Sequence, residues 1–575
     1  MNFITLGVRA LLFGLSTFGY LTCLHRHSKL KVEFLPAVVF TGQICLLFLA
    51  GLLNLLPLAV IGLFAAGLLL ALYSWRDRKS YRDFLCVGYV FFVTVCLYFL
   101  ILFKGQVFNS YDNFSHWALV VKQMLLTDRF PTFQDHIILF QSYPLGSSSF
   151  IYYVCRIISP ISEGCQMFAQ VMLDLSMILP LFSYAKKNKW GNTVLIAGLT
   201  VFLLSFNTDP NELLVDTLLP LTGAAGFLLL EEELLGERRE IWCTVPLAIA
   251  GILIKNSGIF FFALMAFRVI LFWVQHRKTA ARAEKLSWLS LLLLPLFALL
   301  LWKKHVEYVY EAGMSTVHSM SISTYLQNFQ AKSGEAIPQI LEAFFKQICS
   351  GRSLLYLLGI LLIVAILAAI QKEETHSFGK TALCVFVVFA LYQAGNLGMY
   401  LFSMPQGEAL VMAGYPRYYR SIIIWCMVYA MSRILRWMDE QKPVISLVFI
   451  LLAFLCFRQM GGNLQILKRT PTGSERKALE QIMEEYPLAL SVPYLVYIPA
   501  DDYGYTYHLT KYLFYTPTVD VHITSDRAEV EQAVDIAIEL GYRYFINLDP
   551  ENQMLQEYCR ETFGVSEGTP LIELQ

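Results

Sequence analysis

The stretch SLLYLLGILLIVAILAAIQ, residues 353–371, contains no charged side chain. As a helix, it is long enough to cross the roughly 30 Å hydrocarbon core of a membrane. Similar apolar stretches recur from the start of the chain to residue 458, at 3–24, 33–53, 57–74, 84–104, 164–184, 192–206, 212–230, 241–256, 259–275, 287–302, 353–371, 380–402, 418–435 and 443–458. The sequence therefore predicts an all-α polytopic membrane protein with about 12–14 transmembrane helices.

The composition supports this fold class. Hydrophobic residues make up 56% of the 575 residues, and charged residues only 15%. A soluble domain has roughly 25% charged residues, so this chain has too little polar surface to cover a water-facing globule. The net charge of zero gives no indication of a nucleic-acid partner.

Short basic clusters separate several of the apolar stretches. They lie at His25 to Lys31, Arg76 to Lys79, Lys186 to Lys189, Arg238 and Arg239, and His276 to Arg282. All fall on the same side of the predicted spans, which by the positive-inside rule is the cytoplasmic side. The remaining loops, 105–145, 303–350 and 403–417, and everything after residue 459 are then expected outside.

The first long outer loop, 105–145, has a helical pattern at its start. Phe114, Trp117, Val121, Met124 and Leu125 recur at helical spacing, while Asp112, Ser115, His116, Lys122 and Gln123 fall largely on the other side. This pattern predicts an amphipathic helix at the membrane surface. Residues 146–160 are apolar but short, and the topology requires that they do not fully cross.

The character of the sequence changes after residue 459. A helix is expected around 474–486, a strand at 495–498, a helix at 528–540 and a second strand at 544–547. This order predicts a small soluble α/β domain at 459–575, following a transmembrane domain at 1–458.

Three groups of residues carry a resemblance to a known family. They are Tyr111 to Lys122 with Tyr143-Pro-Leu-Gly146, Asn211 to Thr217 with Lys255-Asn-Ser-Gly258, and Gln406 to Arg420. An aspartate early in the first large outer loop, followed by Tyr-Pro-Leu, resembles the GT-C fold of membrane glycosyltransferases. The nearest branch is that of the protein mannosyltransferases and aminoarabinose transferases, which use polyprenyl-phosphate-linked sugars. This sequence departs from the simple family pattern in having about four spans before the aspartate loop.

The resemblance implies a hexosyltransferase-type reaction that inverts the anomeric carbon, and Asp112 is the candidate general base. The lipid-phosphate leaving group would need cations at the membrane interface. The candidates for substrate binding are His116, Lys122, Asp216, Lys255, Glu408, Arg417 and Tyr418. Asp112, Asp216 and Glu408 could also bind a divalent metal, since the family includes metal-dependent and metal-independent members.

Structural interpretations compete with these assignments. Asp112 could cap the surface helix, His116 could be a solvated interfacial residue, Lys255 could extend to the interface, and Arg417 could be a flanking charge. Asp216 is predicted inside a span, where a carboxylate is costly and usually functional.

The leading hypothesis is therefore a glycosyltransferase in the cytoplasmic membrane of a bacterium, with the C-terminal domain extracytoplasmic. Its partners would be a polyprenyl-phosphate-linked sugar, the lipid bilayer and a cell-envelope glycan, lipid or protein acceptor. A polysaccharide polymerase or ligase is an alternative, but an arginine-rich outer loop would be expected for it. A lipid-linked sugar flippase or transporter would be expected to show inverted repeats and broken spans.

Overall fold

The computed structural model describes residues 3–75, 81–187, 189–236, 239–310, 322–370, 375–441, 443–459, 463–486, 489–523 and 526–574. The chain forms two compact units. The first comprises 1–105, 124–130 and 140–469, and the second comprises 106–123, 131–139 and 470–575. The second unit therefore combines the C-terminal segment with two stretches of the loop 105–145.

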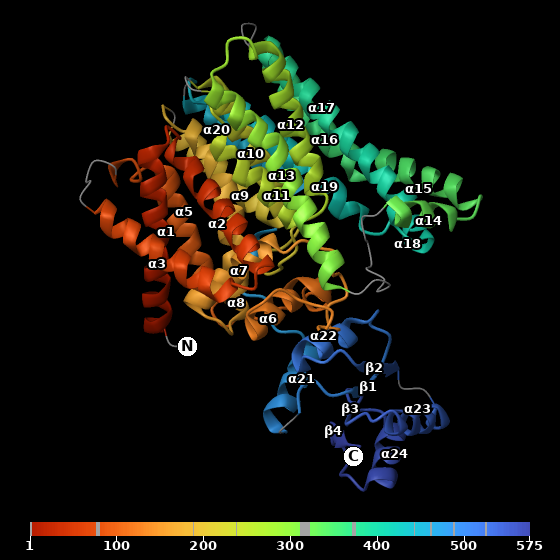
Figure 1. The fold of residues 1–575 in the computed structure, drawn as a ribbon. Helices are drawn as coiled ribbons and strands as arrows, with labels where there is room; N and C mark the ends of the chain where they lie inside the picture. Colours follow the sequence, from red (N-terminus) through yellow and green to blue (C-terminus); the bar gives the residue numbers. More distant parts are fainter. Residues whose placement is uncertain are drawn as a thin grey trace. The chain divides into compact units, whose positions relative to one another are not determined.

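Ten helical segments among the described residues are long and apolar enough to cross a membrane. They are α1 (Phe3–His27), α2 (Leu35–Leu52) with η1 (Val32–Phe34), α3 (Leu56–Ser74), α8 (Glu163–Ile178) with η3 (Leu179–Tyr184), α9 (Lys189–Phe206), α12 (Gly258–His276), α13 (Arg282–Val309), α16 (Arg352–Ile370), α17 (Thr375–Gly398) with η5 (Met399–Ser403), and α19 (Tyr415–Met438). Four further apolar helices are α5 (Val87–Leu102), α10 (Leu218–Leu235), α11 (Val245–Ile254) and α20 (Pro443–Gln459). Every predicted span coincides with one of these helices, so the chain is a multi-pass helical membrane protein (Figure 1).

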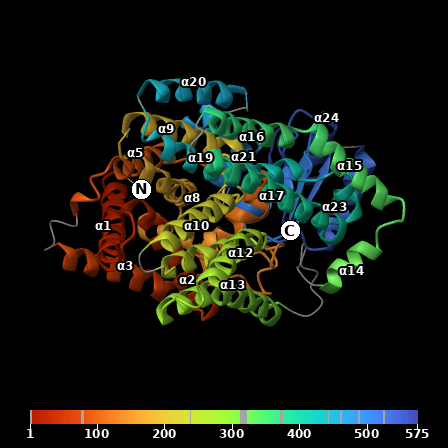
Figure 2. The same ribbon diagram turned by 90° about the horizontal axis from the view of Figure 1, so that it is seen from above.

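Burial distinguishes central from peripheral helices in the first unit. All residues of α8 from Gly164 to Ile178 are buried, whereas α3, α13 and α16 expose many apolar side chains. Figure 2 shows α8 and α10 in the middle of the helices, with α3, α13 and α20 around them. The exposed apolar faces are those expected to contact lipid, because lipid tails are as apolar as these side chains.

The predicted basic loops meet at one end of these helices. Lys31, which follows α1, forms an ion pair with Glu232 near the end of α10. The backbone N–H groups of Lys186 and Lys187 each lie 2.9 Å from a carboxylate oxygen of Asp439, which follows α19. These contacts agree with the prediction that the loops share one side of the membrane.

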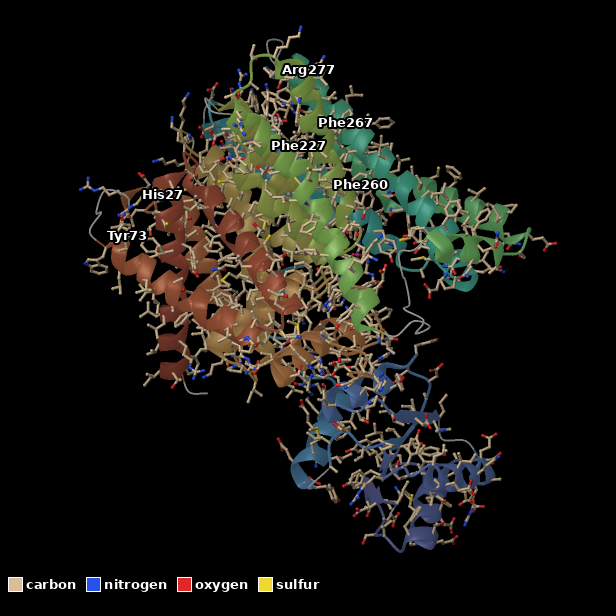
Figure 3. The ribbon with its side chains drawn as sticks, in the orientation of Figure 1. His27, Tyr73, Phe227, Phe260, Phe267 and Arg277 are labelled. Carbon is tan, nitrogen blue, oxygen red and sulfur yellow. The ribbon has the colours of Figure 1, made fainter. Side chains whose placement is uncertain are left out.

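In Figure 3, Arg277 lies at the upper end of α12, just after the helix, and Phe260 lies lower, toward the start of the same helix. Arg76 to Lys79 and Arg238, which belong to two of the predicted clusters, lie outside the described residues.

The long loop 105–145 contains a helix at the predicted place, but its polar side is not exposed. A π-helical segment η2 (Asn113–Trp117) leads into α6 (Ala118–Thr127). Ser115, His116 and Gln123 are buried along with the apolar residues. The helix therefore lies where the sequence predicts it, but part of its polar side is buried, because this stretch packs within the second unit.

Residues 146–160 form α7 (Gly146–Ile158), a helix of 13 residues. Its length of about 20 Å, at 1.5 Å per residue, is shorter than a membrane core. This agrees with the expectation that the segment does not fully cross.

The predicted outer loops 303–350 and 403–417 are largely helical where they are described. The first contains the end of α13, then α14 (Ile322–Gln330) and α15 (Ala336–Ser350), and the second contains the short helix α18 (Gln406–Leu410). Residues 311–321 lie outside the described part of the chain.

The C-terminal segment forms an α/β fold around a four-stranded sheet of order β2-β1-β3-β4. Strands β1 (Tyr494–Ile498), β2 (Val519–Ile523) and β3 (Tyr544–Asn547) are parallel, and β4 (Leu571–Glu573) runs antiparallel to β3. The connecting helices are α22 (Tyr505–Phe514), α23 (Arg527–Glu539) and α24 (Gln553–Phe563), and α21 (Ser474–Glu485) precedes the sheet. The predicted helix–strand–helix–strand order is confirmed, and α22, β2, α24 and β4 are additional elements.

Candidate functional site

A buried ion pair in the first unit joins two of the sequence candidates. The Lys255 ammonium donates a hydrogen bond to Asp216 Oδ1 at 2.8 Å. The side chains are 17% and 5% exposed, respectively. A buried pair is costly to dehydrate, so a fold that retains it at helix ends makes it a strong functional candidate.

Asp216 does not lie within a helix, which corrects the prediction that places it inside a span. It belongs to the turn between α9 and α10, and α10 begins only at Leu218. The Asn207 amide donates to the backbone oxygen of Asp216 at 3.0 Å and to that of Arg417 at 3.1 Å. The Ser421 hydroxyl also donates to the Asp216 backbone oxygen, at 2.9 Å. These bonds fix the turn to the first turns of α19.

Lys255 follows the last residue of α11 and has an extended backbone, with φ −157° and ψ 145°. The side-chain N–H groups of Asn256 and Trp302 both donate to the backbone oxygen of Ser142, at 3.4 and 3.0 Å. The chain before α7 is thereby held against the segment that carries Lys255.

Gly146 makes this close approach possible. A Cβ atom at Gly146 would lie 2.6 Å from the backbone oxygen of Leu253, a separation that requires the backbone to move. The Tyr-Pro-Leu-Gly run thus places Tyr143 where its hydroxyl is within the electrostatic influence of Lys255, Asp216 and Arg417.

Arg417 and Tyr418 belong to the first turn of α19. Gly414, with φ +72°, begins this helix, and a Cβ atom there would lie 3.1 Å from the Tyr418 ring. The Lys255 ammonium lies 5.8 Å from the centre of the Tyr418 ring. The structure therefore brings together Asp216, Lys255, Arg417 and Tyr418 from three separate regions of the sequence.

The charges of this site stabilise an ionised Asp216, which lies outside the spanning helices. Burial alone would raise the pKa of its carboxyl group. The nearby Lys255 ammonium and Arg417 guanidinium outweigh this effect and hold the pKa below its ordinary value. We therefore treat the pair as a carboxylate and an ammonium at neutral pH.

Glu408 lies on α18 and is exposed. It lies on a different element from Asp216, Lys255 and Arg417.

The other three candidates, Asp112, His116 and Lys122, belong to the second unit. Asp112 immediately precedes η2, and its side chain makes no capping hydrogen bond there, so the capping interpretation has no support. The His116 ring contacts the Trp117 ring at 5.0 Å between centroids. The Lys122 ammonium donates to the backbone oxygens of Tyr512 and Leu513, within the second unit.

The described residues do not offer an evident metal site. Among them, no group of three or more His, Cys, Asp or Glu side chains is arranged to hold a metal ion. The Asp216 carboxylate is bonded to Lys255, which is a poor arrangement for a metal ligand.

A polar stripe on the buried helix α8 was missed in the sequence. Gln166, Gln170 and Asp174 lie four residues apart, on one face of the helix. Each is at least 95% buried, and Gln166 Oε1, both Gln170 amide atoms and Asp174 Oδ1 have no hydrogen-bond partner among the described residues. The four-residue spacing was the signal that could have found them.

The fold and these features define a multi-pass membrane protein with a charged site at the ends of its helices. No protein-family model matches the chain, and no curated protein matches it. Among solved structures, the fold is similar to the crystal structure of ArnT from Cupriavidus metallidurans bound to undecaprenyl phosphate. The match has 13% sequence identity, covers 84% of this chain and 98% of that chain, and has a TM-score of 0.39. A likeness this distant gives no residue-by-residue correspondence, so the roles of residues rest on the geometry of this chain.

Proposed function

We propose that this protein is a membrane glycosyltransferase that moves a sugar from a polyprenyl-phosphate-linked donor to an extracytoplasmic acceptor. The observation that carries the proposal is the buried Lys255–Asp216 pair with Arg417, Tyr143 and Tyr418 around it.

The first unit supplies the groups for the phosphate. Two cations, Lys255 and Arg417, stand against one carboxylate, Asp216, so these three side chains together carry one positive charge. Arginine suits a phosphate because its planar guanidinium can donate two parallel hydrogen bonds. Asp216 holds Lys255 in place and keeps it protonated. The hydroxyl groups of Tyr143 and Tyr418 add neutral donors.

Asp112 is the general base in this proposal. Asp112 immediately precedes η2, and π-helical turns occur frequently at functional sites. A carboxylate accepts the proton of an acceptor hydroxyl as that oxygen attacks, which makes the hydroxyl a better nucleophile.

The reaction then follows as a single displacement. The acceptor oxygen forms a bond to the anomeric carbon, and its proton passes to Asp112. The bond between the anomeric carbon and the phosphate oxygen breaks, and its electron pair stays on the lipid phosphate. Lys255 and Arg417 stabilise the charge that develops there. One displacement inverts the configuration of the anomeric carbon.

The sidedness of the site agrees with an extracytoplasmic reaction. The basic loops gather at the end of α10 that carries Glu232, and Asp216 precedes the opposite end of that helix. If the basic end is cytoplasmic, Asp216 and Lys255 lie at the outer face. The C-terminal segment, which follows α20, is proposed on that same outer side.

The proposal is tested by transfer of labelled sugar from polyprenyl-phosphate donors in membranes carrying the wild-type chain, Asp112→Asn or Asp501→Asn. Asp501 is a matched control because it is exposed in the second unit and accepts a hydrogen bond from the nearby backbone N–H of Tyr503, at 2.9 Å. We expect transfer by the wild type and by Asp501→Asn, and loss with Asp112→Asn at equal protein level. Equal transfer by all three would remove Asp112 from the mechanism.

A second candidate function is movement of a lipid-linked sugar across the bilayer. The polar stripe of α8 favours it, because buried polar groups inside a membrane domain often mark a substrate path. Absence of transfer with any tested donor, together with movement of a labelled lipid-linked sugar across reconstituted vesicles that Asp174→Asn abolishes, would favour this function.

A further inference from the structure

The segment that carries Asp112 is folded into the C-terminal domain. Residues 106–123 and 470–575 belong to the same compact unit, although more than 340 positions separate them in sequence. Several independent contacts hold the segment on both sides of Asp112.

The first group of contacts lies just before Asp112. The Gln106 amide donates to the backbone oxygen of Thr470 at 2.7 Å. The Asn109 side chain donates to the backbone oxygen of Pro471 at 3.0 Å and accepts from the backbone N–H of Gly473 at 3.1 Å. The nitrogen and the oxygen of the Asn109 side-chain amide are therefore both hydrogen-bonded to the chain that enters the C-terminal domain.

Arg476, on α21, makes the second contact. Its guanidinium donates to the backbone oxygen of Phe108 at 2.8 Å and to Glu480 Oε1 at 2.7 Å. It also lies 5.9 Å from the centre of the Phe114 ring. The Arg476 side chain is only 3% exposed. A buried guanidinium that bonds a loop oxygen and an adjacent glutamate at once fixes that loop more strictly than an exposed side chain would.

Aromatic side chains of α22 hold the part of the segment around Asp112. The centroid of the Phe114 ring lies 5.7 Å from that of Tyr505 and 5.3 Å from that of Tyr512. Tyr111, the neighbour of Asp112, meets His508 edge to face at 4.7 Å. Burial, with a smaller contribution from Lys511, lowers the pKa of His508 to about 4, so this contact joins two uncharged rings at neutral pH.

Lys122 holds the segment on the C-terminal side of Asp112. Its ammonium donates to the backbone oxygens of Tyr512 and Leu513, in the last turn of α22. These oxygens lie at the negative end of the helix dipole, where a cation is favourable.

We propose that the C-terminal domain is the positioning element of the Asp112 segment, with Arg476 as its principal positioning residue. This inference rests on the proposed function, because it takes Asp112 as the base. The domain then works by fixing the backbone on both sides of Asp112, and Arg476 acts through Phe108 without touching substrate. Reactions of this kind are sensitive to such placement, since an error of about 1 Å in a reacting group can lower the rate roughly a hundredfold.

The experiment compares the full-length wild type with Arg476→Gln, Arg476→Lys and Arg527→Gln. Arg527 is a matched control, because it is an arginine of the same domain that bonds Glu531 and Glu561, at 2.9 and 2.7 Å, within the C-terminal domain. Two quantities are measured: amide hydrogen exchange of residues 106–123, and kcat and KM for sugar transfer.

We expect Arg476→Gln to speed exchange across 106–123 and to lower kcat by about tenfold or more, with KM for the donor nearly unchanged. Arg476→Lys should recover part of kcat, because an ammonium can still reach the Phe108 oxygen. Arg527→Gln should change neither quantity. Asn109→Ala removes contacts from the loop side and leaves Arg476 intact. It should also speed exchange and lower kcat, and it replaces Arg476→Gln as the test if Arg476→Gln folds poorly.

Unchanged exchange in both Arg476→Gln and Asn109→Ala would overturn the proposal, as would equal losses with Arg527→Gln. Faster exchange with an unchanged kcat would also overturn it. If the wild type transfers no sugar, the proposed function fails, and the exchange measurement still decides whether the domain holds the segment.

Discussion

Charged groups lie at both ends of α10, but they differ in their burial and in the number of their partners. At its start, the Asp216 carboxylate is 5% exposed and pairs with Lys255, beside aromatic hydroxyls and the charge of Arg417. At its other end, the glutamate cluster of Glu231, Glu232 and Glu233 is bonded by side chains from several elements. Its partners are Arg268 and Arg433 for Glu231, Lys31 and Arg436 for Glu232, and Thr244 for Glu233.

The difference separates the proposed binding site from a structural brace. Glu231 and Glu232 each have two cationic partners and are about 20% exposed, at 19% and 21%. The loss of one partner therefore leaves another in place. Asp216 and Lys255 are more deeply buried and lie in turns at helix ends. Such a pair is costly to break, and the groups around it can meet an anionic ligand.

The largest effect should follow from breaking the Asp216–Lys255 pair. Lys255→Met leaves a buried carboxylate without its ammonium, and we expect a loss of about 3–5 kcal/mol in the free energy of unfolding together with loss of transfer. The double variant Lys255→Met/Asp216→Leu should regain most of the stability, because both charges are gone, but not the transfer. Thermal unfolding in detergent and a transfer assay measure the two effects. A double variant that transfers sugar at the wild-type rate would remove the pair from the site.

Arg417 should give the next largest effect. Removal of one group that stabilises a developing charge typically costs about 10²- to 10³-fold in kcat, so we expect a decrease of this size in kcat/KM for Arg417→Gln. Arg417→Lys should be intermediate, since it keeps the charge and loses the planar fork. Arg433→Gln, at the other end of the first unit, is the control and should stay within about twofold of the wild type. Similar losses with Arg433→Gln would erase the contrast between the two ends.

Glu232→Gln should have a much smaller effect. Its partners are partly exposed, and ion pairs of this kind contribute about 0–1 kcal/mol. We expect the free energy of unfolding to change by no more than about 1 kcal/mol, with transfer unchanged. A loss comparable to that of Lys255→Met would show that the brace is not redundant.

The smallest effect concerns pH. The pKa of Asp216 is lowered from its usual 3.8 in the folded protein, so its stabilising contribution is present above that value and is lost only as the pH falls below it. The stability difference between the wild type and the Lys255→Met/Asp216→Leu variant should therefore be constant between about pH 5 and pH 8. The free energy of unfolding of both proteins, measured across this range, tests the prediction. A stability difference that declines toward pH 5 would contradict an ionised pair.

The spans were predictable because long apolar stretches have few other uses in a protein of this composition. The candidates Asp216, Lys255 and Arg417 could also be selected from the sequence, as charges at the edges of apolar stretches. The pairing of Lys255 with Asp216 could not be predicted, since the two residues are 39 positions apart and meet through tertiary packing.

The errors have the same origin. The helical spacing of residues 113–123 predicts a helix with a polar side, but the burial of part of that side depends on a segment more than 340 positions away. The missed strands β2 and β4 are the two edges of the sheet, whereas the predicted β1 and β3 are central and fully buried. The edge strand β2 carries the polar residues Asp520 and His522 and is largely exposed, so it lacks the continuous apolar run that marks a buried strand. The four-residue spacing of Gln166, Gln170 and Asp174 inside the predicted span 164–184 was visible in the sequence, but the complete burial of that face is a result of the packing of α8.

The most direct test of the account is the affinity of the purified full-length protein for a polyprenyl phosphate and for the matching polyprenol, measured by native mass spectrometry. The wild type and Glu232→Gln should bind the phosphate more tightly than the alcohol, and Arg417→Gln should lose most of this preference. Equal affinity for the two lipids in the wild type, or a preference that Glu232→Gln abolishes and Arg417→Gln does not, would contradict the assignment of the Asp216 end of α10 as the phosphate site.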